Sequence, residues 1–413
     1  MRRDKLKINY CLLLLIAPML IHCASVEKKD IRESQTPVNI QEEKEIVVGD
    51  LQTERYLPQL KNKIVGVVAN HTAILGSTHL VDSLLSLGIN VKLVFSPEHG
   101  FRGSADAGEK VNNQTDAKTG LPIISLYGDN KKPTAAQLRG IDVLLFDIQD
   151  VGARFYTYIS TLHYVMEAAA EQDIPLIVLD RPNPNGHYVD GPVLNPKYRS
   201  FVGLHPVPIV HGLSIGEYAQ MVSGEKWLDN GVSCDLTVIT CKNYSHDDYY
   251  QLKVAPSPNL PNMNSIYLYP SLCLFEGTAI SVGRGTTAPF QQYGHPGLKS
   301  FKEYFTPTPS YGAKEPKLKG QKCYGEKIKL DWQKDLSAIP RQLNLDYLLT
   351  AYQVFPNKSD FFNSFFNLLA GNNLLKQQIQ GNKTAAEIRE SWKNDLEAYK
   401  QKRKKYLLYK DFE

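Results

Sequence analysis

The segment KIVGVVAN, residues 63–70, is an almost unbroken run of apolar, mostly β-branched residues that ends in an asparagine. Four similar runs follow at intervals of roughly 20 to 30 residues, the spacing of strand–helix–strand units. They are VKLVFS (91–96), LPIISLY (121–127), VLLFDIQ (143–149) and PLIVLDR (175–181). Because polar residues hardly alternate with the apolar ones, the runs are typical of parallel strands that are covered on both faces.

Between these runs, three segments repeat apolar residues at helical spacing. They are HLVDSLLSLG (79–88), TAAQLRGI (134–141) and YISTLHYVMEAAAEQD (158–173). The alternation predicts an α/β fold with a Rossmann-like, doubly wound parallel sheet. No GxGxxG motif follows the first run and no GxxxxGK[ST] motif occurs, so neither a dinucleotide site nor a phosphate-binding loop is predicted.

The length of 413 residues indicates two domains. We expect the Rossmann-like domain at residues 49–240 and a smaller α+β domain at residues 241–413. The boundary is placed there because proline, asparagine and glycine become concentrated after about residue 240. The net charge of +4 is small and lies largely in the terminal KQKRKKYLLYK. A lysine-rich final helix is usually a solvated face, so no nucleic-acid partner is predicted.

The N-terminus has the features of an export signal. MRRDKLK supplies positive charge, and the apolar run CLLLLIAPML is shorter than the roughly 20 residues that cross a bilayer. The run ends in LIHCAS, which resembles a bacterial lipobox, so residues 1–23 are predicted as a lipoprotein-type signal with Cys23 as the lipidated residue. The alternative is an ordinary signal peptide in which this cysteine is incidental. Residues 24–48 are charged and poor in aromatics, as in a tether.

This N-terminus predicts a periplasmic or cell-surface lipoprotein that touches the membrane only through its lipid anchor. The cysteines beyond it predict no metal centre, since none forms a CxxC motif and no Cys/His cluster has zinc spacing. Cys234 and Cys241 lie seven residues apart in one predicted strand. Their side chains would point to opposite faces, so a disulfide framework is not expected either.

Polar side chains follow most of the predicted strands, at the edge where open α/β sheets bind ligands. In a further run, PVPIVHG, a histidine follows the apolar residues. Polar residues could simply begin loops, but their recurrence at strand after strand favours a functional cleft. The candidates at these ends are Asn70, His71, Glu98, His99, Asp147, Asp150, Asp180, Arg181 and His211.

The loop PEHGFRG (97–103) holds the leading candidate for acid–base chemistry. Its proline and glycines favour a sharp turn that places Glu98 half-sheltered from water, where burial raises the pKa of a carboxyl group toward that of a general acid. His99 and Arg102 could orient Glu98 or contact a substrate. The structural alternative for Glu98 is a helix cap or a surface ion pair.

Three more loops carry candidates for binding. DIQDVGARFYTYIS (147–160) adds Arg154 and Tyr156 to its two aspartates, although Asp150 could be only a helix cap and the aromatics could belong to the core. The long loop DRPNPNGHYVDGP (180–192) offers Arg181 and Asn183. In FEGTAISVGRGT (275–286), Glu276 and Arg284 supply a second carboxylate and a cation, and the glycines allow close approach of a ligand.

Together, the motifs VANHTA, SPEHGFRG, DIQDVGARFYTY, LDRPNPNG, VDGP, SIGEYA, PSPNLPN and FEGTAISVGRGT resemble the family of exo-β-N-acetylmuramidases. The resemblance runs from about residue 48 to the terminal helix. It implies a Rossmann-like domain and a smaller second domain with the active site between them. It also implies removal of N-acetylmuramic acid from the non-reducing ends of peptidoglycan fragments, with Glu98 as the leading catalytic carboxylate.

The residues agree with this substrate for a separate reason. N-acetylmuramic acid carries a lactyl carboxylate, which an arginine can bind in a bidentate fork. The predicted loops contain Arg102, Arg154, Arg181 and Arg284. A peptidoglycan-derived saccharide is therefore the expected partner.

Glycoside hydrolysis ordinarily uses two carboxyl groups, about 5 Å apart for retention and roughly 6.5–9.5 Å apart for inversion. We expect Glu98 to be the general acid. Its partner is left open among Asp147, Asp150, Asp180 and Glu276, with the N-acetyl group of the substrate as a further possibility. None of these mechanisms needs a metal or an organic cofactor.

Two other classes of function remain as alternatives. A lipid-anchored protein that binds muropeptides without catalysis would also have two domains and a cleft, but it gains nothing by burying acids beside an acidic sugar. A serine hydrolase is disfavoured because no serine at the end of a predicted strand has a histidine in clear support.

Overall fold

The computed structural model describes residues 45–98, 100–102 and 114–413. All of them fall within one compact unit, Lys44–Glu413. The predicted signal with Cys23, residues 24–44 of the predicted tether, and His99 lie outside the described residues. No helix among the described residues combines the length and the apolar character needed to cross a membrane.

Within the described residues, seven strands form the main sheet in the order β5-β6-β4-β1-β7-β8-β9, and only β5 runs antiparallel to its neighbour. Their bounds are β1 Ile64–Ala69, β4 Asn90–Ser96, β5 Gln114–Thr115, β6 Pro122–Ser125, β7 Val143–Asp147, β8 Leu176–Leu179 and β9 Leu236–Ile239. Counted along the chain, the parallel strands lie in the order 3-2-1-4-5-6, which is the doubly wound Rossmann arrangement. The predicted sheet is confirmed, and each of the five predicted runs contains one strand.

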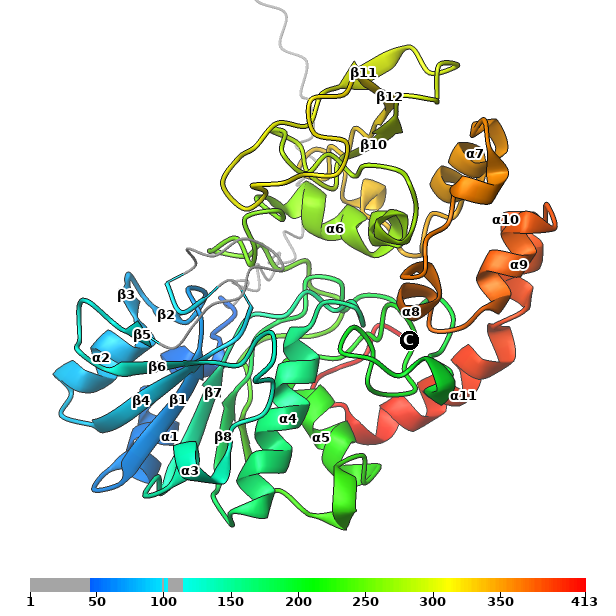
Figure 1. Cartoon of the computed structure of the whole chain (residues 1–413). Coiled ribbons are helices and arrows are strands. Elements are labelled where there is room, and N and C mark those ends of the chain that lie inside the picture. Colours follow the sequence, from blue (N-terminus) through cyan, green and yellow to red (C-terminus); the bar gives the residue numbers. More distant parts are fainter. Residues whose placement is uncertain (1–44, 99, 103–113) are drawn as a thin grey trace, which may run out of the picture. The chain divides into compact units, whose positions relative to one another are not determined.

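The apolar runs are continuous because helices cover both faces of the sheet (Figure 1). The helices of this region are α1 Thr53–Leu60, α2 Leu80–Ser86, α3 Ala135–Leu138, α4 Tyr158–Glu171 and α5 Ile215–Gly224. Val67 of β1 packs in one buried cluster with α1 and α2, whereas its neighbour Val68 packs in another with α4 and α5. Successive side chains of a strand point to opposite faces of the sheet. A strand in which every residue is apolar therefore contributes to the hydrophobic core on both faces.

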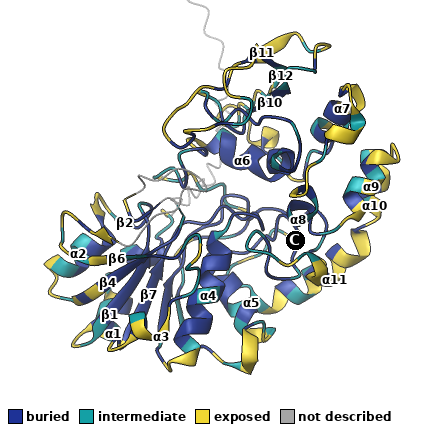
Figure 2. Cartoon of the chain, in the orientation of Figure 1, coloured by how far each residue is buried: buried dark blue, intermediate teal, exposed yellow. Residues whose placement is uncertain are grey.

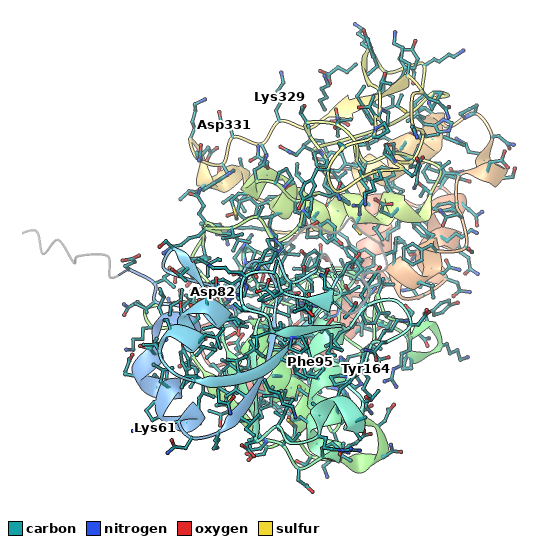
Figure 3. The ribbon with its side chains drawn as sticks, turned by 60° about the vertical axis from the view of Figure 1, so that its left-hand side comes forward. Lys61, Asp82, Phe95, Tyr164, Lys329 and Asp331 are labelled. Atoms are coloured by element: carbon teal, nitrogen blue, oxygen red, sulfur yellow. The ribbon has the colours of Figure 1, made fainter. Side chains whose placement is uncertain are left out.

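Strands β1 and β7 are dark blue in Figure 2 because they are buried in the middle of the sheet. Phe95 of β4 belongs to the same interior, and it is fully buried. In Figure 3 it lies among packed side chains, whereas Lys61 and Lys329 lie at the surface of the molecule.

The C-terminal part mixes strands and helices, as expected for an α+β region. Its antiparallel sheet has the order β10-β12-β11, with β10 Gln292–His295, β11 Glu303–Phe305 and β12 Cys323–Lys327. Its helices are α6 Met263–Leu272, α7 Asp346–Val354, α8 Phe366–Ala370, α9 Leu374–Gln380, α10 Ala385–Glu390 and α11 Lys393–Arg403. The exact boundary near residue 240 stays a prediction.

The remaining elements are short. A small ribbon pairs β2 Ile74–Leu75 with β3 Thr78–His79. The 3₁₀ turns are η1 Gly49–Leu51, η2 Pro196–Tyr198, η3 Asp229–Gly231, η4 Cys273–Gly277, η5 Leu336–Ala338, η6 Lys358–Asp360 and η7 Lys404–Tyr406. The run PVPIVHG, which ends in His211, forms isolated bridges at Val210 and not a strand of the sheet.

The last helix, α11, returns to the loops of the main sheet, next to α5 in Figure 1. Tyr399 donates a hydrogen bond to the carbonyl of His211 at 2.7 Å, and Arg403 donates one to the carbonyl of Gly212 at 2.9 Å. Arg403 is fully buried. The C-terminal helix therefore stabilises the loop that follows PVPIV, and its Lys402 forms an ion pair at 2.8 Å with Glu225 at the end of α5.

Candidate active site

A cavity of about 730 Å³ lies where the carboxyl ends of β4 and β6 and the start of α4 meet the C-terminal part of the chain. Its lining consists of Glu98, Tyr127, Phe155, Thr157, Phe201, Val202, Tyr269, Cys273, Glu276, Arg284, residues 312–317, Phe365 and Leu369. A smaller hollow of about 60 Å³ shares Glu98 and Arg284 with it and adds Tyr156. Of the predicted site residues, the structure brings these four together: Glu98, Tyr156, Glu276 and Arg284.

Glu98 reaches the cavity because β4 ends at Ser96 and the chain turns at once. Gly100 has a φ of 76°, a left-handed conformation that glycine adopts without strain. Thr157 donates a hydrogen bond from Oγ1 to Oε2 of Glu98 at 3.1 Å. Burial, and then the charge of Glu98, raise the pKa of the Tyr127 hydroxyl, which therefore stays protonated. The carboxyl group of Glu98 is half-buried among hydroxyl groups, as suits a group that exchanges a proton with a substrate.

Arg284 and Glu276 form an ion pair in the wall of the same cavity. The Nε atom of Arg284 donates to Oε1 of Glu276 at 2.7 Å, and the guanidinium lies 4.9 Å from the centre of the Phe290 ring. Burial by itself would raise the pKa of Glu276, but the charges of Arg284 and Lys317 lower it. Glu276 therefore remains ionised in the folded protein.

Asp147 and Arg181 belong to a buried ion cluster. Arg181 donates to Oδ1 of Asp147 at 2.5 Å, to Oδ2 at 2.9 Å, and to Oδ2 of Asp50 at 2.8 Å. Both aspartates are fully buried. Strands β7 and β8 are neighbours, so the residues at their ends pair with each other. Arg181 lines a separate hollow of about 140 Å³, and neither it nor Asp147 lines the cavity of Glu98.

Asp150 and His211 lie side by side in the interior. Oδ2 of Asp150 accepts a hydrogen bond from the backbone of Gly152 at 2.7 Å and lies 3.8 Å from Nε2 of His211. Burial raises the pKa of Asp150 to about 7 and lowers the pKa of His211 to about 3. Near neutral pH this histidine is uncharged, and the pair is a structural element outside the cavity.

The wild type is expected to lose stability as the pH rises, because burial raises the pKa of Asp150. Replacement of Asp150 by asparagine is expected to remove this loss. The unfolded carboxyl titrates near its ordinary pKa of 3.8, whereas the folded one titrates at about 7. Between these values the unfolded state releases a proton that the folded state keeps, so the free energy of unfolding falls as the pH rises. Thermal unfolding at about pH 4 and about pH 8 should therefore show Asp150→Asn gaining melting temperature over the wild type only at the higher pH.

Asp331→Asn is the control for this measurement, because Asp331 is exposed at the surface (Figure 3). An equal difference between Asp150→Asn and the wild type at both pH values would show that Asp150 is not the titrating group.

Other predicted residues form the scaffold around the cavity. The guanidinium of Arg154 is fully buried and donates at 2.8 Å to the carbonyls of Pro192, Val207 and Leu369. Tyr156 lines the smaller hollow, and its hydroxyl donates a hydrogen bond to the carbonyl of Pro256 at 2.9 Å. Arg154 thus ties the main sheet region to α8 of the C-terminal part.

Asn70 and His71 fix the loop after β1. Asn70 donates to the hydroxyl of Tyr158 at 2.9 Å, and Nε2 of His71 lies 2.8 Å from the carbonyl of Ala255. Neither lines the cavity of Glu98. The loops after β1 and β7, between which Rossmann folds usually hold their ligand, contribute Thr72 and Gln149 to the separate hollow of about 140 Å³.

Arg102, Asp180 and Asn183 also make contacts within the protein. Arg102 forms ion pairs with Asp82 at 3.0 Å and Asp116 at 2.8 Å. Asp180 accepts hydrogen bonds from Ser214, Gly216 and Tyr409, and Asn183 donates to the carbonyl of Leu213 at 2.9 Å. These residues hold loops in place and do not line the cavity.

Sequence reasoning did not single out Tyr127, Thr157 or Lys317. Tyr127 ends the predicted strand LPIISLY, so the rule applied to the other strand ends would have found it. Thr157 lies inside the motif DIQDVGARFYTYIS, in which only charged and aromatic residues are predicted to bind. Lys317 lies in a segment without a recognisable signal, and its ammonium donates to the carbonyl of Thr278 at 2.9 Å.

Two family models match the chain in succession. The N-terminal model of the exo-β-N-acetylmuramidase NamZ matches residues 65–264, and the C-terminal model matches residues 267–409. The chain belongs to the NamZ family of exo-β-N-acetylmuramidases. The peptidoglycan β-N-acetylmuramidase NamZ of Bacillus subtilis (strain 168) is 40% identical over 379 residues, covering 86% of this chain and 89% of that protein.

Two crystal structures of DUF1343 family proteins from Bacteroides fragilis NCTC 9343 share the fold. One has a TM-score of 0.82 and 49% identity, and covers 89% of this chain and 100% of its own. The other has a TM-score of 0.76 and 29% identity, and the match covers 88% of this chain and 99% of the other protein's chain. The resemblance noted in the sequence motifs is confirmed by these matches along most of the chain.

The described residues provide no cluster of three or more His, Cys, Asp or Glu side chains that could hold a metal ion. Cys234, Cys241, Cys273 and Cys323 are buried and free of disulfide bonds.

Proposed function

We propose that this chain is an exo-acting glycoside hydrolase that releases N-acetylmuramic acid from the non-reducing ends of peptidoglycan fragments, with Glu98 as the general acid. The observation that carries the proposal is the position of Glu98 in a cavity at the carboxyl edge of the sheet. The name of the Bacillus subtilis relative supports the activity and the substrate class.

The geometry suits proton donation to a leaving sugar. The hydrogen bond from Thr157 fixes the carboxyl group of Glu98, which transfers its proton to the glycosidic oxygen as the bond to the anomeric carbon breaks. A water molecule then adds its oxygen to that carbon and its proton returns to a carboxylate. Tyr127, Phe201 and Tyr269 provide aromatic surface for the apolar face of the sugar ring.

Incubation with the disaccharide N-acetylmuramyl-β-1,4-N-acetylglucosamine tests the activity, and free N-acetylmuramic acid should accumulate with time. A fragment that carries N-acetylglucosamine at its non-reducing end should stay intact, because the enzyme acts only on a terminal muramic acid. Intact disaccharide after prolonged incubation would favour the alternative of a muropeptide-binding protein.

We also propose that the chain is exported and anchored through a lipid on Cys23, on the basis of the LIHCAS sequence alone. Cys23→Ser should move the protein from the membrane fraction to the soluble fraction of the expressing bacterium. Retention of the variant in the membrane fraction would contradict lipid anchoring at this cysteine.

A further inference from the structure

We infer that Arg284 selects the acidic sugar by binding its lactyl carboxylate, and that Glu276 is the positioning residue that aims Arg284. This inference rests on the proposed function, because the ligand is the carboxylate that distinguishes N-acetylmuramic acid from N-acetylglucosamine. It also gives Glu276 a role other than that of the second catalytic carboxylate.

The four candidate arginines differ in whether a substrate can reach them. Arg102 and Arg181 each bind two aspartates, and the terminal nitrogens of Arg154 donate to backbone carbonyls while the side chain is fully buried. None of the three lines the cavity of Glu98. Arg284 lines both this cavity and its smaller extension.

The terminal nitrogens of Arg284 are available to a substrate carboxylate. Its Nε atom is occupied by Glu276 at 2.7 Å, whereas neither of its terminal nitrogens has a hydrogen-bond acceptor in the described part of the chain. The side chain is 25% exposed. Two adjacent N–H groups of a guanidinium match the two oxygens of a carboxylate. Stacking on Phe290 restrains the plane of this fork.

Glu276 lies between two positively charged side chains. Lys317 lies 4.0 Å from Oε2 of Glu276 on one side, and Arg284 binds Oε1 on the other. Arg284, Lys317 and Glu276 together carry one net positive charge, so Glu276 does not fully neutralise the two cations beside it. A carboxylate held between two cations is a weaker base and nucleophile, so Glu276 is better suited to orienting Arg284 than to attacking a sugar.

The test compares two chromogenic probes that differ only in charge: 4-nitrophenyl β-N-acetylmuraminide and the methyl ester of its lactyl group. The wild type should prefer the acid by roughly 10- to 100-fold in kcat/KM, the range of a charge-assisted hydrogen-bonded pair. In Arg284→Met the ratio of the two kcat/KM values should fall to near unity, because kcat/KM for the acid decreases while that for the ester does not. Arg199→Gln is the control, because Arg199 is an exposed residue outside the cavity and should keep the wild-type preference.

The ratio of the two probes separates selectivity from folding, because partial unfolding lowers both rates equally. If Arg284→Met does not fold, Arg284→Lys serves in its place, since it keeps the charge but lacks the fork and should lose most of the preference. An Arg284 variant that keeps the full preference, or a wild type that does not distinguish acid from ester, would overturn the inference and leave the proposed function standing. A wild type that hydrolyses neither probe and also leaves the disaccharide intact would instead refute the proposed function.

Glu276→Gln separates positioning from catalysis. A positioning role predicts a higher KM for the acid, a reduced acid-to-ester preference and little change in kcat/KM for the ester. An equal loss of kcat of about 10²-fold or more on both probes would show that Glu276 acts on the reacting atoms, and would overturn its assignment as a positioning residue.

Discussion

Glu98→Gln is expected to lower kcat/KM for the muramyl disaccharide by about 10²- to 10⁴-fold, the contribution typical of a positioned general acid. The amide has the shape of the carboxyl group and still accepts the hydrogen bond that Thr157 gives to Glu98. It cannot transfer a proton to the glycosidic oxygen. Release of free N-acetylmuramic acid, followed over time by chromatography, measures the effect.

A comparison of two substrates with different leaving groups tests whether Glu98 donates a proton. A nitrophenolate departs without a proton, whereas a sugar alkoxide does not, so Glu98→Gln should lose much less activity on 4-nitrophenyl β-N-acetylmuraminide than on the disaccharide. Glu171→Gln is the matched control, since Glu171 ends α4 outside the cavity. Equal losses on both substrates would argue against a proton-donor role, and full activity would remove Glu98 from the mechanism without affecting the family membership.

Arg181→Met is expected to lower the free energy of unfolding by about 3–5 kcal/mol, the cost of leaving a buried charge without its partner. Arg181 binds Asp147 and Asp50 at distances of 2.5–2.9 Å, and both aspartates are fully buried. Methionine fills a similar volume but provides no donor. Urea denaturation with linear extrapolation to water gives the difference.

A second substitution tests the cause of this loss. Asp147→Asn in the Arg181→Met background removes one of the two uncompensated charges, so the double variant should be more stable than Arg181→Met alone. A loss below about 1 kcal/mol for Arg181→Met would be typical of an exposed ion pair and would contradict the structural role. A normal unfolding transition combined with a raised KM would instead favour the binding role predicted from the sequence.

Much of the fold follows from the sequence because the signals are local. The uninterrupted apolar runs and the helical repeats between them predict strands and helices without any knowledge of distant residues. YISTLHYVMEAAAEQD became α4, and CDLTVITC contains β9. Right-handed crossovers between parallel strands place the helices on the faces of the sheet, whereas the order of the strands is set by tertiary packing. The motifs were long enough to indicate the family.

The functional roles of the residues at the strand ends were less predictable from the sequence. Side chains at the ends of neighbouring strands can pair with each other instead of binding a ligand. Asp147 and Arg181 follow adjacent strands and neutralise one another in the interior. Glu98 follows β4, near the side of the sheet where the C-terminal part leaves a cavity. The sequence places all three residues at the same edge, and only packing separates them.

The sequence by itself determined the doubly wound sheet, the family and the loop that carries Glu98. Only the tertiary structure decided which of the four arginines lines the cavity of Glu98, since Arg284 is distant from Glu98 in the sequence. It also decided that Glu276 is paired with that arginine and with Lys317. The physical reason is that strand and helix formation depend on neighbouring residues, whereas the charge and exposure of a buried side chain depend on which distant elements pack against it.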